Sequence, residues 1–217
     1  MNSMKLTSGI LKTALGVVKR SALVAAALTC LAGTALGATQ YAAGTFTWDN
    51  ASTAAWGSSS GGPYTSTWTS GNDAVLEGSA GTITISSPTA HNITFNTTGY
   101  TLSGGSTLTL TTAAATITTG SGISATIGNN TATSIGGSVG LAKAGAGTLT
   151  LNGSAANAFT GNLTLNGGTL TLDFANMGTP TDLLNSAVTF NGGGGTLLIK
   201  GKSGGGTTSQ TLGVPNE

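Results

Sequence analysis

The amino-acid sequence predicts an all-β protein folded as a parallel β-helix, a solenoid whose coils stack with their strands side by side. Three short segments alternate a polar residue with leucine, which is the period-two pattern of a strand with one buried and one solvated face. They lie at 148–152, 162–166 and 169–173, and each ends in Asn or Asp. Leu149 and Leu170, at equivalent positions of the first and third segments, are 21 residues apart, a spacing typical of one solenoid coil.

The composition indicates a thin, repetitive core. Of the 217 residues 36 are glycine, and only 6% are charged and 5% aromatic, whereas about a quarter of an ordinary soluble domain is charged. Disorder is the alternative interpretation of so much Gly and Ser. However, Leu, Ile and Val recur regularly from Ile83 to Ile199, which disordered chains usually lack. An ordered solenoid is therefore favoured.

Residues 1–37 have the pattern of a secretory signal peptide. A basic region precedes an apolar stretch from Ala22 to Leu31, and small residues then lead to an expected cleavage after Gly37. The apolar stretch is shorter than the roughly 20 residues of a spanning helix, so we expect contact with the export machinery and no stable membrane span in the mature chain. Cys30 lies within this leader, so the mature chain is expected to have no disulfide.

The charge distribution argues against nucleic-acid binding. The formal net charge is +1, but the mature region holds only Lys143, Lys200 and Lys202 as basic residues, against six acidic ones, which gives −3. It contains no arginine. A nucleic-acid binder needs Lys and Arg to neutralise phosphates, so this class of function is excluded.

Residues 38–80 are predicted to form an N-terminal cap and entry segment. They hold all three tryptophans, Trp48, Trp56 and Trp68, and few alternating runs. The terminal repeat of a solenoid needs a cover over its open core, which bulky aromatic side chains can supply. A sugar-stacking platform is the alternative, but no cluster of acidic and amide residues surrounds the tryptophans in the sequence. The cap is the preferred interpretation.

Residues 81–217 are predicted to form the β-helix coils, of roughly 20 to 27 residues with two or three strands each. Antiparallel hairpins are the alternative, because residues 166–168 could form a tight Asn-Gly-Gly turn. A hairpin sheet would need a second sheet to cover it, whereas stacked coils cover themselves. The further strands are expected at 82–85, 92–95, 107–110, 115–118, around 123–127, and within 188–199.

The segment 140–174 resembles the autotransporter-associated β-strand repeat, also called the passenger-associated transport repeat. Gly-Leu-Ala-Lys-Ala-Gly-Ala-Gly-Thr-Leu-Thr-Leu at 140–151, Asn-Ala-Phe-Thr-Gly at 157–161 and the two Leu/Thr segments that follow carry the resemblance. It implies a right-handed parallel β-helix in the passenger region of a large bacterial protein, secreted or displayed on the cell surface. It brings no catalytic residues. Nothing after Lys202 resembles a C-terminal cap, so we expect either the N-terminal portion of a longer, autotransporter-like protein or a truncated reading frame.

The sequence predicts no catalytic, cofactor-binding or metal site. Polysaccharide lyases and hydrolases of this shape need carboxylates that hold calcium or share a cleft. The acids nearest in sequence, Asp73 and Glu77, lie in a loop-like stretch and are expected to be solvated. His91 has no cysteine or second histidine nearby, so we expect a loop residue and not a ligand or base. The segment 196–203 ends like a P-loop but lacks its first glycine.

The predicted function is a non-enzymatic exported or cell-surface structural protein, a β-helix stalk serving adhesion. A polysaccharide-binding or polysaccharide-degrading β-helix is the alternative, and extracellular polysaccharide or a surface is the candidate partner. A remote alternative is an ice-binding solenoid, because outward threonines could form ladders, although such ladders mainly stabilise the sheet. The threonines concerned are Thr107, Thr109, Thr148, Thr150, Thr169 and Thr171.

Overall fold

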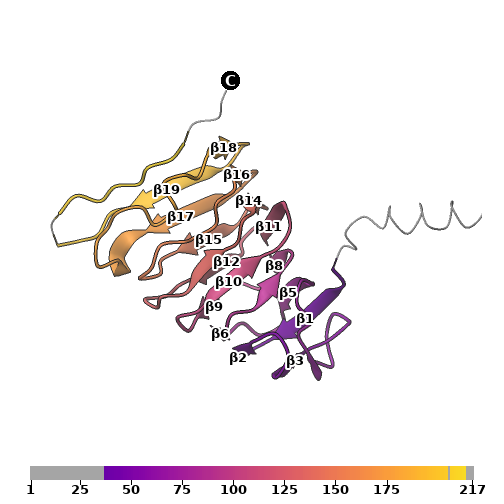
Figure 1. The fold of residues 1–217 in the computed structure, drawn as a ribbon. Helices are drawn as coiled ribbons and strands as arrows, with labels where there is room; N and C mark the ends of the chain where they lie inside the picture. Colours follow the sequence, from indigo (N-terminus) through magenta and orange to yellow (C-terminus); the bar gives the residue numbers. More distant parts are fainter. Residues whose placement is uncertain (1–36, 205, 214–217) are drawn as a thin grey trace, which may run out of the picture. The chain divides into compact units, whose positions relative to one another are not determined.

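The computed structural model describes residues 37–204 and 206–213, which lie in one compact unit, so the predicted signal peptide falls outside the described residues except for Gly37. Three parallel sheets run along this unit (Figure 1). Sheet A contains, in spatial order, β1 (Thr39–Ala43), β5 (Asp73–Glu77), β8 (Ile93–Phe95), β11 (Ala114–Thr119), β14 (Gly140–Ala144), β16 (Leu163–Leu165) and β18 (Phe190–Gly192). Sheet B contains β2 (Phe46–Trp48), β6 (Thr82–Ile85), β9 (Tyr100–Ser103), β12 (Ser124–Ile127), β15 (Thr148–Leu151), β17 (Thr169–Asp173) and β19 (Thr196–Lys200).

The third sheet, sheet C, is shorter and contains β7 (Thr89–Ala90), β10 (Thr107–Leu110) and β13 (Ser134–Gly136). An antiparallel pair, β3 (Ala54–Trp56) and β4 (Ser66–Thr67), and a 3₁₀ turn at Phe174–Asn176 complete the regular elements. The chain passes from sheet A to sheet B in every coil, and each strand of these sheets pairs with its counterpart in a neighbouring coil. The predicted parallel β-helix is therefore confirmed.

The hairpin alternative is wrong for the segment that suggested it. The strands on either side of residues 166–168 are β16 and β17, and they belong to different sheets. Leu149 instead faces Leu170 in register, as the 21-residue spacing predicted. The register also shows that coil length varies, because Ile93 faces Ile117 whereas Lys143 faces Leu165.

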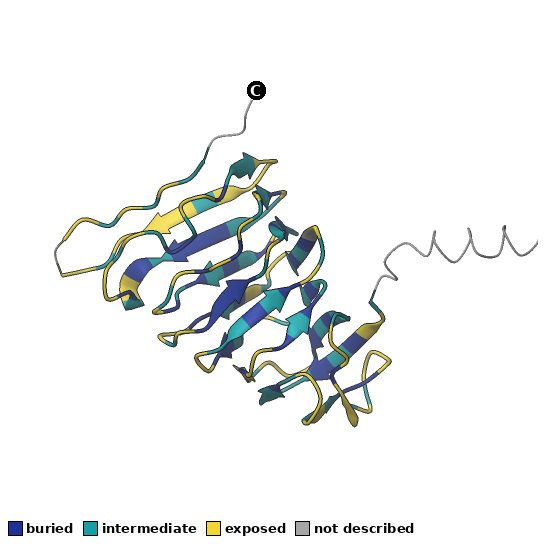
Figure 2. Cartoon of the chain, viewed as in Figure 1, coloured by how far each residue is buried: buried dark blue, intermediate teal, exposed yellow. Residues whose placement is uncertain are grey.

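The core consists of inward side chains stacked coil above coil, and Figure 2 shows the resulting alternation of buried and solvent-facing residues along the strands. Burial of such rows stabilises the fold by about 25 cal/mol for each Å² of apolar surface that is removed from water. In sheet B the rows end at the edge strand β19, where Leu198 and Ile199 are 41% and 47% exposed. Among the described residues, these are the large apolar side chains that are exposed. One row in sheet B runs Tyr100, Ala125, Leu149, Leu170, Leu197, and a second runs Leu102, Ile127, Leu151, Leu172, Ile199.

Two glycines allow neighbouring coils to approach at the corner between sheets A and B. A Cβ on Gly147 would lie 2.2 Å from the carbonyl oxygens of both Gly120 and Ile123 in the preceding coil. Gly168, one coil later, has φ +65°, and its Cβ would lie 2.2 Å from the Gly147 oxygen. The steric demand explains why glycine precedes the Thr-Leu-Thr-Leu run in each of these coils.

Asn157 adds side-chain hydrogen bonds to the pairing on the third side of the later coils, where it also forms an isolated parallel bridge with Leu184. It is buried, its side-chain oxygen accepts a hydrogen bond from the Ile135 amide at 2.8 Å, and its side-chain amide donates to the Leu183 carbonyl at 3.0 Å. One side chain thus joins three coils. This contact gives a physical reason for the asparagine that begins the Asn-Ala-Phe-Thr-Gly segment.

The three tryptophans pack against one another in the core. Trp48, Trp56 and Trp68 are at most 2% exposed, and their ring centroids lie 4.4 to 5.0 Å apart. The Trp68 indole N–H donates to the Thr89 carbonyl at 2.9 Å. Their faces are unavailable to a ligand, so the sugar-stacking alternative is wrong. The limits of a separate cap at 38–80 stay a prediction.

The threonine ladders form only in part. Thr148 and Thr150 of β15 face Thr169 and Thr171 of β17 in register on sheet B, but Thr171 is only 3% exposed. The two threonines of β10 lie in sheet C and do not extend the ladder. Cross-strand Thr contacts of this kind stabilise a sheet.

Within residues 37–204 and 206–213, the structure contains no helix whose length and hydropathy would let it cross a membrane.

Candidate functional site

His91 and Asp73 meet across successive coils, a contact that the sequence reasoning did not predict. Asp73 begins β5, and His91 lies two residues before β8, the next strand of sheet A. His91 Nδ1 is 2.7 Å from Asp73 Oδ1, which also accepts hydrogen bonds from the Asn92 backbone amide at 3.1 Å and its side-chain amide at 2.9 Å. The feature that could have predicted this contact is that Asp73 and Asn92 occupy equivalent positions in neighbouring coils.

This cluster has the chemistry of a link between coils. Among the described residues, His91 Nε2 has no hydrogen-bond partner, so no hydroxyl nucleophile is attached to the pair. In the same part of the chain, no group of three His, Cys, Asp or Glu side chains is placed to hold a metal ion. The Asp73 carboxylate is instead occupied by three donors that fix the start of β8.

Glu77 differs from the solvated loop residue that we expected. It ends β5, is only 8% exposed, and its carboxylate accepts hydrogen bonds from Ser60 Oγ at 2.7 Å, the Gly61 amide at 2.8 Å and Tyr64 Oη at 3.0 Å. Burial acts to raise the pKa of Glu77, but these three hydrogen bonds outweigh it and hold the pKa below its ordinary value. Glu77 therefore fastens the loop between β3 and β4 to sheet A.

Glu77→Gln should destabilise the chain by about 1–2 kcal/mol at neutral pH, because a neutral amide accepts these hydrogen bonds less strongly. A lowered folded-state pKa gives stability that is present above the ordinary carboxyl pKa and is lost as the pH falls through the folded value. The difference between wild type and variant should therefore shrink as the pH falls below about 4. Urea unfolding across this pH range measures it, and a difference that does not change with pH would contradict the assignment.

Lys143 is fully buried, which its charge alone would not suggest. Its position in β14 alternates in phase with inward Leu141, and it stands in register between Ile117 and Leu165. Its ammonium donates to the carbonyl oxygens of Ala144 at 2.7 Å, Gly145 at 3.0 Å and Gly167 at 3.3 Å. Lys143 thus joins the corner turns of two successive coils. Burial lowers its pKa from the ordinary lysine value.

Lys143→Met should cost about 1–3 kcal/mol at neutral pH, because the three carbonyls lose their donor. Since the folded-state pKa is lowered, the unfolded chain binds more protons at alkaline pH, and the wild type should gain stability relative to the variant as the pH rises from about 7 toward 10. Urea unfolding at several pH values tests this. Lys200→Met is the matched control, because the Lys200 side chain is 55% exposed and should contribute less than about 0.5 kcal/mol. Equal effects of the two changes would refute the role of Lys143.

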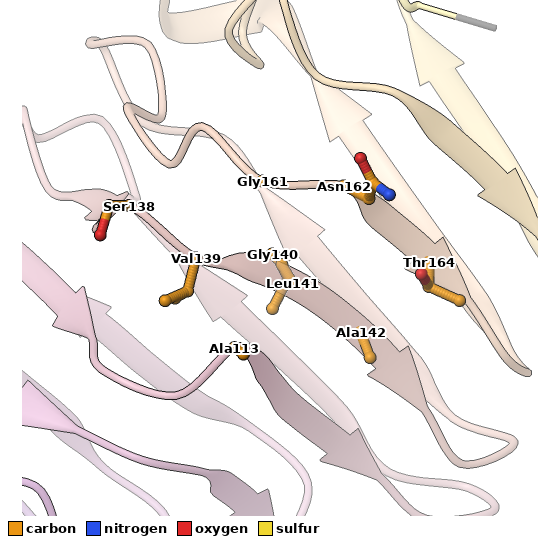
Figure 3. A pocket seen from close by; sticks show the side chains of 9 residues that line it. All are labelled: Ala113, Ser138, Val139, Gly140, Leu141, Ala142, Gly161, Asn162 and Thr164. Carbon is orange, nitrogen blue, oxygen red and sulfur yellow. The ribbon is translucent and has the colours of Figure 1, made fainter. Parts of the chain in front are cut away.

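An open pocket of about 420 Å³ lies on the outer face of sheet A, and Figure 3 shows its lining; we call it the β14 pocket. Ala142 of β14 and Thr164 of β16 are outward neighbours in register. Gly140 has no side chain, and a Cβ there would lie 2.7 Å from the Asn162 carbonyl oxygen. The surface is therefore recessed at β14. The sequence did not predict this pocket. The feature that could have indicated it is Ala142, a small residue at the outward position where the neighbouring coils have Thr116 and Thr164.

Comparisons with known proteins bear on the repeat region. Residues 141–172 match the family described as Passenger-associated-transport-repeat. The chain is also 48% identical over 130 residues to a protein of Brucella suis biovar 1 (strain 1330) named "Adhesin BmaC autotransporter". That match covers 57% of this chain but spans only 4% of the relative's length. No solved structure matches the chain. The resemblance to an autotransporter passenger repeat protein is confirmed.

Proposed function

We propose that this chain is an exported, non-enzymatic passenger segment that is displayed at the cell surface and contributes to adhesion. The observation that carries the proposal is the 48% identity to an autotransporter adhesin over 130 residues, together with the separate match of residues 141–172 to a passenger repeat. The fold is compatible with this role, because each coil covers the next and the solenoid needs no thick core. A stack of coils can therefore present its outer faces without a catalytic cleft.

Immunolabelling of intact bacteria that produce the full protein tests the display. An antibody against residues 38–213 should label intact cells, and external protease should remove the label. A strain from which the gene is deleted should adhere several-fold less to cultured host cells or to a polysaccharide-coated surface. Labelling that requires permeabilised cells would overturn the display, and unchanged adherence would overturn the adhesive role.

The enzymatic alternative is a polysaccharide-degrading β-helix. Such catalysis needs carboxylates directed into one cleft or around calcium. Glu77 is held by three hydrogen bonds within the first coils, and Asp73 is held by His91 and Asn92. We therefore expect no turnover when the purified chain is incubated with acidic polysaccharides, with or without calcium. Release of unsaturated or reducing ends would reverse this conclusion.

A further inference from the structure

We propose that the β14 pocket binds a neutral saccharide. This inference rests on the proposed adhesive function and deepens it, because it names the class of ligand and the place where it would bind. The pocket volume of about 420 Å³ lies within the range of roughly 300–1,000 Å³ typical of small-molecule sites. It is formed by three adjacent coils, with residues contributed next to or within β11, β14 and β16.

Three polar side chains at the pocket are unused by the fold. Within the described part of the chain, the side chains of Ser138, Asn162 and Thr164 form no hydrogen bond. Asn92, on the same outer face, behaves differently, since its amide donates to Asp73 at 2.9 Å and accepts from the Thr116 backbone amide at 2.9 Å. The hydroxyl and amide groups around the β14 pocket are thus free to bind a ligand.

The lining favours an uncharged, amphiphilic ligand. No Lys, Arg, Asp, Glu or His is among the residues that line the pocket, so an ionic group would find no opposite charge there. Methyl groups of Ala113, Ala142 and Val139 lie among the polar side chains (Figure 3). A sugar ring presents C–H groups that can contact such methyls and hydroxyls that can both donate to and accept from Asn, Ser and Thr.

The backbone argues against an extended peptide as the occupant. Peptides commonly bind sheets by adding a strand to a free edge. Here β11 pairs with β8 and β14, β14 with β11 and β16, and β16 with β14 and β18, so none of these strands has a free edge. A ligand of the pocket must be bound through side chains, which fits saccharide hydroxyls better than a peptide backbone.

The proposal is tested by adding neutral gluco-, galacto- and manno-trisaccharides to the ¹⁵N-labelled chain at about 10 mM, well above a dissociation constant of about 1 mM. At least one should shift the amide resonances of residues 138–142 and 161–164 in a saturable way. Ala142→Phe, which fills the pocket, should abolish the shifts. Asn162→Ala should weaken binding about threefold to tenfold, as expected for one lost hydrogen bond.

Thr126→Ala is the matched control, because it removes an outward hydroxyl from sheet B and should leave the shifts unchanged. The dispersion of the same spectra reports whether each variant is folded. No shifts with any neutral sugar, shifts outside the pocket, or binding only of an acidic trisaccharide would overturn the proposal. If bacteria carrying Ala142→Phe adhere like wild type while the deletion strain does not, the saccharide site is wrong and the adhesive function stands.

Discussion

Gly147→Ala is expected to destabilise the fold by more than about 3 kcal/mol, at or beyond the upper end of ordinary overpacking. The new Cβ would lie 2.2 Å from the carbonyl oxygens of Gly120 and Ile123. The Ile123 oxygen cannot easily retreat, because it accepts a hydrogen bond from the Thr148 amide at 2.8 Å. The two coils would have to separate at the corner between sheets A and B, and the inward rows beside it would lose contact.

Urea unfolding followed by circular dichroism measures this loss. Gly178→Ala is the matched control, because its Cβ would meet nothing within 4 Å and its backbone does not need a positive φ. The control should stay within about 0.5 kcal/mol of wild type. If the two alanine variants unfold at the same urea concentration, the close approach of the coils at Gly147 is not as described.

Leu149→Ala is expected to cost about 2–5 kcal/mol, the range for truncation of a buried leucine. Leu149 is completely buried and is flanked in its row by Ala125 and Leu170. Ala125 is already small, so the cavity would open between two coils that cannot close around it without shifting their registered strands.

Thr150→Ala is the matched control for this change, because Thr150 is the next residue on the same strand and faces outward. It should cost less than about 1 kcal/mol, mainly through strand propensity. Thermal or urea unfolding compares the two variants. A larger loss of stability in Thr150→Ala than in Leu149→Ala would mean that Thr150, and not Leu149, faces the core.

The alternation of apolar and polar residues predicted the coil and most of the strands after residue 80, but not β7, β9, β13 or β14. The run at Thr148–Leu151 predicted both its own strand and its partner one coil later, because the buried face repeats in every coil. Strands expected at 92–95 and 115–118 appear as β8 and β11 with boundaries shifted by one residue. The antiparallel pair β3 and β4 was not predicted, because its short strands lie in a stretch without alternation.

The polar contacts could not be predicted because they join residues in neighbouring coils whose lengths vary. Asp73 and its partner Asn92 are 19 residues apart in the sequence, whereas Ile117 and its partner Lys143 are 26 residues apart. Without the length of each coil, a sequence does not identify Asp73 as the partner of His91 or Gly167 as a partner of Lys143. Glu77 also depends on the loop at 60–64, whose conformation has no periodic signal.

The most direct test of the parallel β-helix is the set of backbone NOE contacts in solution between the strands at residues 140–144, 148–151, 163–165 and 169–172. The described register predicts contacts between Leu149 and Leu170 and between Leu141 and Leu163, with adjacent strands running in the same direction. It predicts no ladder of contacts between β16 and β17, which lie in different sheets. A ladder that pairs residues 163–165 with 169–172 in opposite directions would contradict the stacked coils.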